Sequence, residues 1–182
     1  MLSDVKTFSE TNALGKTGER IVLDFLKGQG YQVEDLSDDL DWQGADVDLS
    51  IEAADGKKVY GEIKTDTEMW MTGNIFLEIS MERQNSGITA EGWYSYSLAD
   101  QLYYLCAGTG KLYVLPFAQL RSYVDDGHGK YVRFRNRTDS NTVGSGVLLN
   151  VSELLEDGII AQAFDINTKE LWPFAWRKPV PF

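Results

Sequence analysis

Hydrophobic positions recur every three or four residues between Asn12 and Lys27, a spacing that places them on one face of a helix. Gly28-Gln29-Gly30 follows at once, and glycine is common just past the end of a helix. The pattern therefore predicts a first helix over residues 12–27. The apolar positions of its buried face are Leu14, Ile21, Val22, Phe25 and Leu26.

Beyond this helix, short apolar runs alternate with turn residues, which is typical of strands. The clearest unit is a hairpin of Val47–Ala53 and Lys58–Lys64, because the connecting Asp55-Gly56 is a strong hairpin signal. Further strands are predicted over Tyr31–Val33, Ile75–Ile79, Leu102–Ala107, Lys111–Leu115, Lys130–Arg137 and Val147–Asn150. Helices are predicted over Phe117–Val124 and Val151–Asp157, a loop over Asp35–Trp42, an irregular stretch over Glu82–Tyr96 and an extended tail over Leu171–Phe182. For Leu102–Leu105 a helix stays open as the alternative.

Length and composition describe a globular chain of 182 residues, of which 43% are hydrophobic. At about 100–200 residues per domain, we expect a single domain over residues 1–182. No apolar run reaches the ~18 residues of a membrane span, and the N-terminus lacks the basic and apolar segments of a signal peptide. Cys106 is the only cysteine, which excludes an internal disulfide and a multi-cysteine zinc site. We therefore expect a cytoplasmic protein without membrane contact.

Charged side chains gather on the predicted hairpin. Glu62 and Lys64 are two residues apart on one strand and so share a face, and Asp48 lies at the start of the partner strand. Two carboxylates on neighbouring strands can bind one hard divalent cation, with water and a backbone carbonyl completing its shell. Lys64 could then orient or deprotonate a water, while the ion polarises a phosphate. The first helix adds a third acid, Glu19, beside Gly18, which would allow close packing.

The order of these residues resembles a known superfamily. The pattern is Gly18-Glu19 in the opening helix, then Gly44-Ala45-Asp46-Val47-Asp48-Leu49, then Gly61-Glu62-Ile63-Lys64. It is similar to the PD-(D/E)XK nucleases, which include restriction endonucleases and Holliday-junction resolvases. The resemblance implies an α/β, restriction-endonuclease-like fold, in which a mixed central sheet of four strands is flanked by helices. It also implies dependence on Mg²⁺ or Mn²⁺ and hydrolysis of the phosphodiester bonds of DNA.

Carried over residue by residue, the resemblance also assigns roles. The implied metal ligands are Asp48, Glu62, the backbone carbonyl of Ile63 and Glu19, and the implied catalytic residues are Glu19, Asp48, Glu62 and Lys64. For Glu62 and Lys64, the alternative is an ordinary exposed charge pair on a strand.

Three acids leave their roles open. Asp46 competes with Asp48 for the metal, because both would lie on the same face of one strand. Asp48 is preferred because the strand residues Leu49-Ser50-Ile51 follow it directly. Glu19 could instead be a surface residue paired with Lys16 or Lys27. Glu78, on the strand expected beside the site, is a candidate outer acid.

The net charge of −11 opposes general attraction to DNA, so any contact must use a local basic surface. The densest one is Lys130–Arg137, where Arg133, Arg135 and Arg137 would share one strand face. We predict that these arginines bind DNA; alternatively, they pair with the surplus carboxylates. Two other functions stay open, an inactive nuclease fold that binds DNA and an acidic protein-interaction module that mimics DNA. A homodimer stays open as well.

Overall fold

The protein is described here by a computed structural model, which covers residues 8–53, 55–135 and 141–167. Its helices are α1 (Phe8–Gly28), α2 (Leu40–Gln43), α3 (Met69–Thr72), α4 (Trp93–Tyr96), α5 (Phe117–Asp125) and α6 (Val151–Glu156). Its strands are β1 (Gln32–Asp35), β2 (Leu49–Glu52), β3 (Lys58–Asp66), β4 (Asn74–Arg83), β5 (Ile88–Glu91), β6 (Gln101–Cys106), β7 (Lys111–Pro116), β8 (Lys130–Arg135), β9 (Thr142–Asn150) and β10 (Gln162–Asp165).

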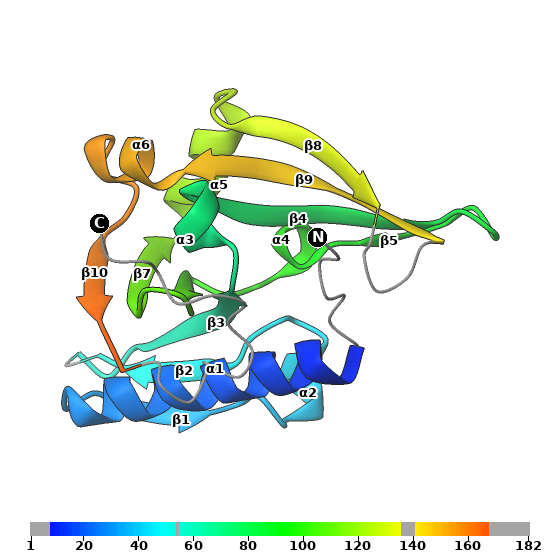
Figure 1. Ribbon diagram of the computed structural model, residues 1–182. Coiled ribbons are helices and arrows are strands. Elements are labelled where there is room, and N and C mark those ends of the chain that lie inside the picture. Colours follow the sequence, from blue (N-terminus) through cyan, green and yellow to red (C-terminus); the bar gives the residue numbers. More distant parts are fainter. Residues whose placement is uncertain (1–7, 54, 136–140, 168–182) are drawn as a thin grey trace.

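These elements form three layers (Figure 1). Helix α1 lies against one face of a six-stranded sheet of order β1-β2-β3-β6-β7-β10, and a four-stranded sheet of order β5-β4-β9-β8 packs on the other face. The six-stranded sheet is mixed, because β3 and β6 run parallel and every other pair is antiparallel. The expected α/β fold with a mixed sheet flanked by helices is confirmed. The sheet has six strands instead of four, and a second sheet joins it.

Strand β6 contributes to both hydrophobic cores, because successive side chains of a strand point to opposite faces. Tyr103 and Leu105 pack with α1, whereas Leu102 and Tyr104 pack between the two sheets. The buried Tyr104 hydroxyl also links the sheets by hydrogen bonds. It donates to Asp66 Oδ2 on β3 (2.7 Å) and accepts from the backbone N–H of Phe76 on β4 (3.2 Å).

Most predicted elements are present. The structure confirms the first helix, both hairpins, α5, the last two predicted strands and α6 in type and place. Leu102–Leu105 is strand, which excludes the helical alternative. Along the described parts of the chain, no helix combines the length and apolar character needed to cross a membrane.

Three expectations need correction or stay untested. The stretch Glu82–Tyr96 is not irregular, because it contains the end of β4, all of β5 and α4. The strand expected over Ile75–Ile79 continues to Arg83 and lies in the four-stranded sheet. The tail predicted over Leu171–Phe182 lies outside the described residues, so the single domain over residues 1–182 stays a prediction.

The contact that positions α1 is made by Gly18. A Cβ at this residue would lie 2.9 Å from Thr65 Cβ on β3 and would overlap the Thr65 hydroxyl oxygen. The helix backbone therefore approaches the sheet more closely than any side chain would allow. Glu19, the next residue, is brought to the edge of β3 by this contact.

We predict that Gly18→Ala lowers the free energy of unfolding by roughly 1–3 kcal/mol, the usual cost of overpacking a core. Gly15→Ala on the same helix is the matched control. Its Cβ would meet nothing closer than Glu19 Oε1 at 3.9 Å, so the helix preference of alanine should stabilise it by up to ~1 kcal/mol. Urea denaturation measures both variants, and equal stabilities would contradict the close contact.

Candidate functional site

Asp48 lies where the hairpin of β2 and β3 ends. Its backbone N–H donates to Gly61 O (2.8 Å), and continuing the strand register by one residue puts Asp48 opposite Glu62. Its side chain accepts a hydrogen bond from the backbone N–H of Ile63, with Oδ2 at 2.8 Å. Beyond the end of β2, the Ile63 N–H of β3 has no strand residue of β2 to pair with, and the Asp48 carboxylate serves as its acceptor instead.

Glu62 is the most deeply buried acid of the site, with 1% of its surface exposed. Its Oε1 forms an ion pair with Lys64 Nζ, and its Oε2 is buried without a hydrogen-bond partner among the described residues. Burial raises the pKa of this carboxyl, and the charge of Lys64 opposes that rise. A buried oxygen without a partner costs free energy, because it has lost its hydration and gained nothing in return.

Lys64 lies between two carboxylates. Besides Glu62, its Nζ contacts Asp46 Oδ2 at 3.2 Å, and it lies 5.1 Å from the centroid of the Trp93 ring. Burial lowers the pKa of Lys64, but the charges of Glu62 and Asp46 together raise it above its usual value. The two carboxylates hold the ammonium group, while the side chain, which is 26% exposed, still reaches solvent in part.

The expectation that Asp46 and Asp48 share a strand face is wrong. Both precede β2, and Asp46 has a φ of 51°, in the left-handed region that aspartate tolerates better than most residues. This turn directs the Asp46 carboxylate to Lys64, whereas the Asp48 carboxylate accepts from the Ile63 N–H. The two acids therefore have different neighbours, and both belong to the site.

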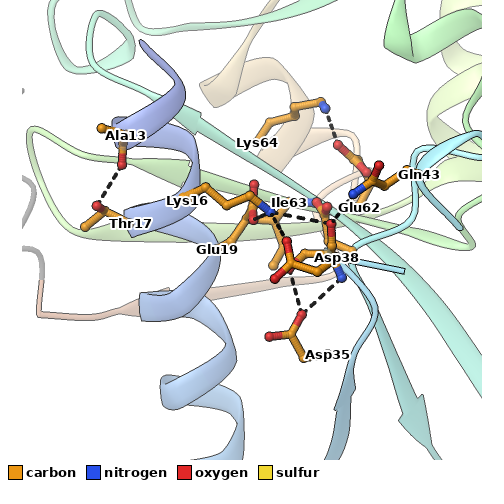
Figure 2. A network of polar contacts seen from close by, with 12 residues as sticks. Ala13, Lys16, Thr17, Glu19, Asp35, Asp38, Gln43, Glu62, Ile63 and Lys64 are labelled. Carbon is orange, nitrogen blue, oxygen red and sulfur yellow. Dashed lines mark hydrogen bonds and ion pairs between the residues drawn. The ribbon is translucent and has the colours of Figure 1, made fainter. Parts of the chain in front are cut away.

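Glu19 reaches the same site from α1. Its Oε2 lies 3.1 Å from Lys16 Nζ, which also contacts Asp38 Oδ1 at 3.2 Å in the loop after β1. Figure 2 shows Lys16 and Glu19 projecting from the helix towards the strand that carries Glu62, Ile63 and Lys64. The pairing with Lys16 is thus present, and it holds Glu19 beside the other acids instead of on a remote surface.

The charges of these groups act on one another. Burial raises the pKa of Asp48 to about 6, the hydrogen bond from Ile63 opposes the rise, and the negative charge of Glu19 adds to it. Burial also raises the pKa of Glu78 on β4, and the charges of Lys64 and Asp46 reach it as well. Glu78 therefore borders the site, although its strand belongs to the other sheet.

The acids of the site offer oxygen donors. Glu62 and Asp46 contact the Lys64 ammonium, the charge of Asp48 reaches it, and Glu19 adds a fourth carboxylate from α1. Oxygen is the ligand that Mg²⁺ prefers. The buried Glu62 Oε2 is a free acceptor. Within the ranges that the structure describes, no three acidic, histidine or cysteine side chains are placed so that they could hold a metal ion together. Instead, the Lys64 ammonium occupies the space between Glu62 and Asp46.

Sequence reasoning missed the contribution of α4. Trp93 faces Lys64, and Tyr96 donates a hydrogen bond to Asp46 Oδ1 at 3.5 Å. Both residues lie in the stretch that the sequence predicts as irregular, and no motif marks them. Only the fold of the second sheet brings this helix to the site.

The predicted arginine surface is described in part. Arg133 lies on β8, at an edge of the four-stranded sheet, and forms an ion pair with Glu82 Oε2 at 2.9 Å. This is the carboxylate pairing that was the alternative to DNA binding. The Arg135 side chain and Arg137 lie outside the described residues, so their role stays a prediction.

Comparison with known proteins finds little similarity to this chain. No protein-family model matches it, and no curated protein is similar in sequence. Among solved structures, the bacterial homing endonuclease I-Ssp6803I is similar, with 17% sequence identity and a TM-score of 0.46. The similar region covers 62% of this chain and 73% of that chain.

The raised pKa of Asp48 predicts a stability effect. Its folded-state pKa of about 6 lies above the usual value of about 3.9 for an unfolded chain. The protonated carboxyl therefore stabilises the fold at low pH, and this contribution is lost as the pH rises through about 6. Asp48→Asn keeps an acceptor for Ile63 and has no charge to desolvate. With a chelator present, we expect this variant to be more stable than the wild type by about 2 kcal/mol at pH 8.

This advantage should disappear between pH 6 and pH 4, where the wild-type carboxyl takes up its proton. Asp24→Asn, at an exposed position on α1, is the control and should show no such gain. Denaturation curves over this pH range make the comparison. A wild type that is equally stable or more stable at pH 8 would contradict the assignment of a buried, destabilising charge to Asp48.

Proposed function

We propose that this protein is a metal-dependent phosphodiesterase that hydrolyses DNA, with the site around Glu62 and Lys64 as its active centre. One observation carries the proposal. Acids from the turn before β2 and from β3 meet around Lys64, and the charge of Glu19 on α1 reaches Asp48, although these residues lie far apart in the sequence. One of them, Glu62, keeps a buried oxygen without a hydrogen-bond partner among the described residues.

Stability alone gives no reason for this arrangement. Burying a carboxylate costs several kcal/mol unless excellent pairing compensates it, and replacing buried ion pairs with apolar residues is often neutral or stabilising. Here a single ammonium serves Glu62 and Asp46 together, and the raised pKa of Asp48 marks another charge that the fold destabilises. Clusters of perturbed acids of this kind are typical of functional sites.

The residues suit the binding of one hard cation. Asp48, Glu62 and the backbone carbonyl of Ile63 would hold it, with Glu19 as a further acid from the helix. When bound, a divalent cation supplies Lewis acidity at the phosphate and makes water more acidic. Asp48 Oδ2 is already engaged by the Ile63 N–H, which fixes the orientation of the carboxylate before any ligand arrives.

Lys64 has a separate task. An ammonium held between carboxylates carries its proton, so in this arrangement it donates hydrogen bonds and is not a base. We assign to it the orientation of the attacking water and the stabilisation of negative charge on the phosphate. In the hydrolysis, a water oxygen bonds to phosphorus and one ester P–O bond breaks. The water's proton passes to solvent and the leaving oxygen is protonated, so that one phosphomonoester and one hydroxyl end result.

DNA as the substrate rests on the resemblance of these residues to the PD-(D/E)XK pattern and on the predicted arginines of Lys130–Arg137. The net charge of −11 means that contacts must be local and that binding should weaken as salt rises. The same charge favours one other function, an acidic module that mimics DNA. Such a module needs no cation, so the binding of Mn²⁺ to the wild type separates the two.

Lys64→Ala tests the assigned role. We expect cleavage of labelled linear, nicked, branched and single-stranded DNA in Mn²⁺ to fall at least a hundredfold, because a positioned charge contributes this much to a transition state. Binding of Mn²⁺, measured by calorimetry, should persist or strengthen, because lysine is no ligand and its own charge repels the ion. Lys58→Ala is the control on the same strand, where it removes an exposed ion pair with Glu34 (2.7 Å) and should change neither result. Unchanged cleavage by Lys64→Ala would exclude the lysine.

A second pair of variants separates Asp46 from Asp48. Asn keeps the shape of both side chains, and it tolerates the left-handed backbone of residue 46. We expect Asp48→Asn to weaken Mn²⁺ binding at least tenfold, because it loses a charged ligand. Asp46→Asn should weaken it less than threefold, since the Asp46 carboxylate serves Lys64. Calorimetric titration at pH 7.5 measures both, and the opposite order would make Asp46 the ligand.

A further inference from the structure

We propose that Trp93 is a positioning residue for Lys64, and that the short helix α4 is the device by which the four-stranded sheet sets the geometry of the active centre. The inference rests on the proposed function, because it assigns a task within that site. On one side, α4 is fixed by hydrogen bonds to β4. On the other side, it contacts Lys64 and Asp46.

Helix α4 is anchored at a β-bulge. The pairing of β4 with β9 shifts register between Glu78 and Ser80, and the carbonyl of Ile79, between them, accepts two hydrogen bonds, one from α4 and one from the residue before it. The donors are the backbone N–H of Gly92 at 2.7 Å and the hydroxyl of Ser95 at 2.9 Å. Bulges of this kind redirect a strand, and they are frequent next to active sites.

Gly92 allows the start of α4 to lie close to β4. A Cβ at this position would lie 2.6 Å from the carbonyl carbon of Glu78, so no other residue allows the helix to start this near to β4. The first helical residue, Trp93, is therefore held at a fixed distance from the strand. A ring placed in this way can restrict a flexible neighbour.

On its other side, α4 and the residues just after it contact two residues of the site, Lys64 and Asp46. The Trp93 ring lies 5.1 Å from Lys64 Nζ, a distance at which the face of an indole attracts a cation. At the end of the helix, the Ser97 hydroxyl donates to the backbone carbonyl of Asp46 at 3.1 Å, and Tyr96 donates to its carboxylate. The backbone N–H of Leu98 donates to Ala45 O at 2.9 Å.

These contacts explain the conformation of Asp46. It is the one residue other than glycine with a positive φ in the described part of the chain. Such a backbone persists only where its surroundings enforce it. Here the segment Tyr96–Leu98 holds the turn, and the turn aims the carboxylate at Lys64.

Lys64 is thus fixed from three directions. Glu62 and Asp46 attract the ammonium, and Trp93 limits where the rest of the flexible side chain can go. A lysine has four side-chain torsions, so without the ring its nitrogen would sample several positions between the two acids. A catalytic group that is misplaced by about 1 Å can lose a hundredfold in rate, which is why such a restriction matters.

The test replaces Trp93 with Phe and with Leu. Both side chains can fill the site, but only Phe keeps an aromatic face, and that face attracts a cation less strongly than indole does. With Mn²⁺ and DNA, we expect kcat to decrease in the order wild type, Trp93→Phe, Trp93→Leu, with a loss of roughly tenfold for Leu and an unchanged KM. Ile88→Ala, at an exposed position on β5, is the control and should cleave like the wild type.

A second readout needs neither metal nor substrate. In protein labelled with ¹³C-lysine, the Lys64 ε-CH₂ signal should be shifted upfield by the Trp93 ring and is assigned by its loss in Lys64→Arg. The shift should become smaller in Trp93→Phe and vanish in Trp93→Leu, while Ile88→Ala leaves it in place. Melting curves confirm that each variant is folded, and if Trp93→Leu is not, Trp93→Phe carries the comparison.

The outcomes are distinguishable. An unshifted Lys64 signal in the wild type, or one that Trp93→Leu does not move, overturns the positioning role whether or not the protein cleaves DNA. Cleavage by Trp93→Leu at the wild-type rate also overturns it. A wild type that cleaves no DNA contradicts the proposed function instead, and the signal then still decides whether Trp93 fixes the lysine.

Discussion

The ion pair between Glu62 and Lys64 is the constraint around which the site is arranged. Both residues point from β3 into the space between the sheets, where Glu62 is almost completely buried. A charge in such a place must be matched, because its hydration is lost. The groups that compensate these charges come from several distant segments of the chain. The turn before β2 contributes Asp46, α4 contributes the Trp93 ring, and α1 adds a further acid nearby.

Local patterns predicted the parts of this arrangement that depend on neighbours in the sequence. The Asp-Gly turn determines which residues of β2 and β3 pair, and the pairing puts Asp48 opposite Glu62. The alternation of side chains then places Lys64 on the face of Glu62. Gly18 was marked as a point of close approach, and it contacts Thr65 as that idea requires. Each of these inferences needs only one turn or one helix.

The missed features depend on contacts between distant segments or on a single backbone angle. Asp46 was assigned to a strand because the alternation of side chains between two faces assumes an extended backbone. The positive φ of Asp46 shows that the backbone is not extended there. β10 pairs with β7 although more than forty residues separate them, and β4 pairs with β9 across a longer interval still. Gly92 resembled a loop glycine, whereas its role is to let α4 touch β4. No local signal distinguishes these cases.

The second sheet gives the site a property that a single hairpin would lack. A lysine on a hairpin can turn to solvent, where its charge is hydrated and its position is undefined. Here β4 forms part of the four-stranded sheet, and its bulge holds α4 against the acids. The Tyr104 hydroxyl also joins Asp66 of β3 to the backbone of β4, so the two sheets are linked close to the strand that carries Glu62 and Lys64. The protein thus keeps charged groups in fixed positions at a cost in stability, which is the compromise expected of a catalytic site.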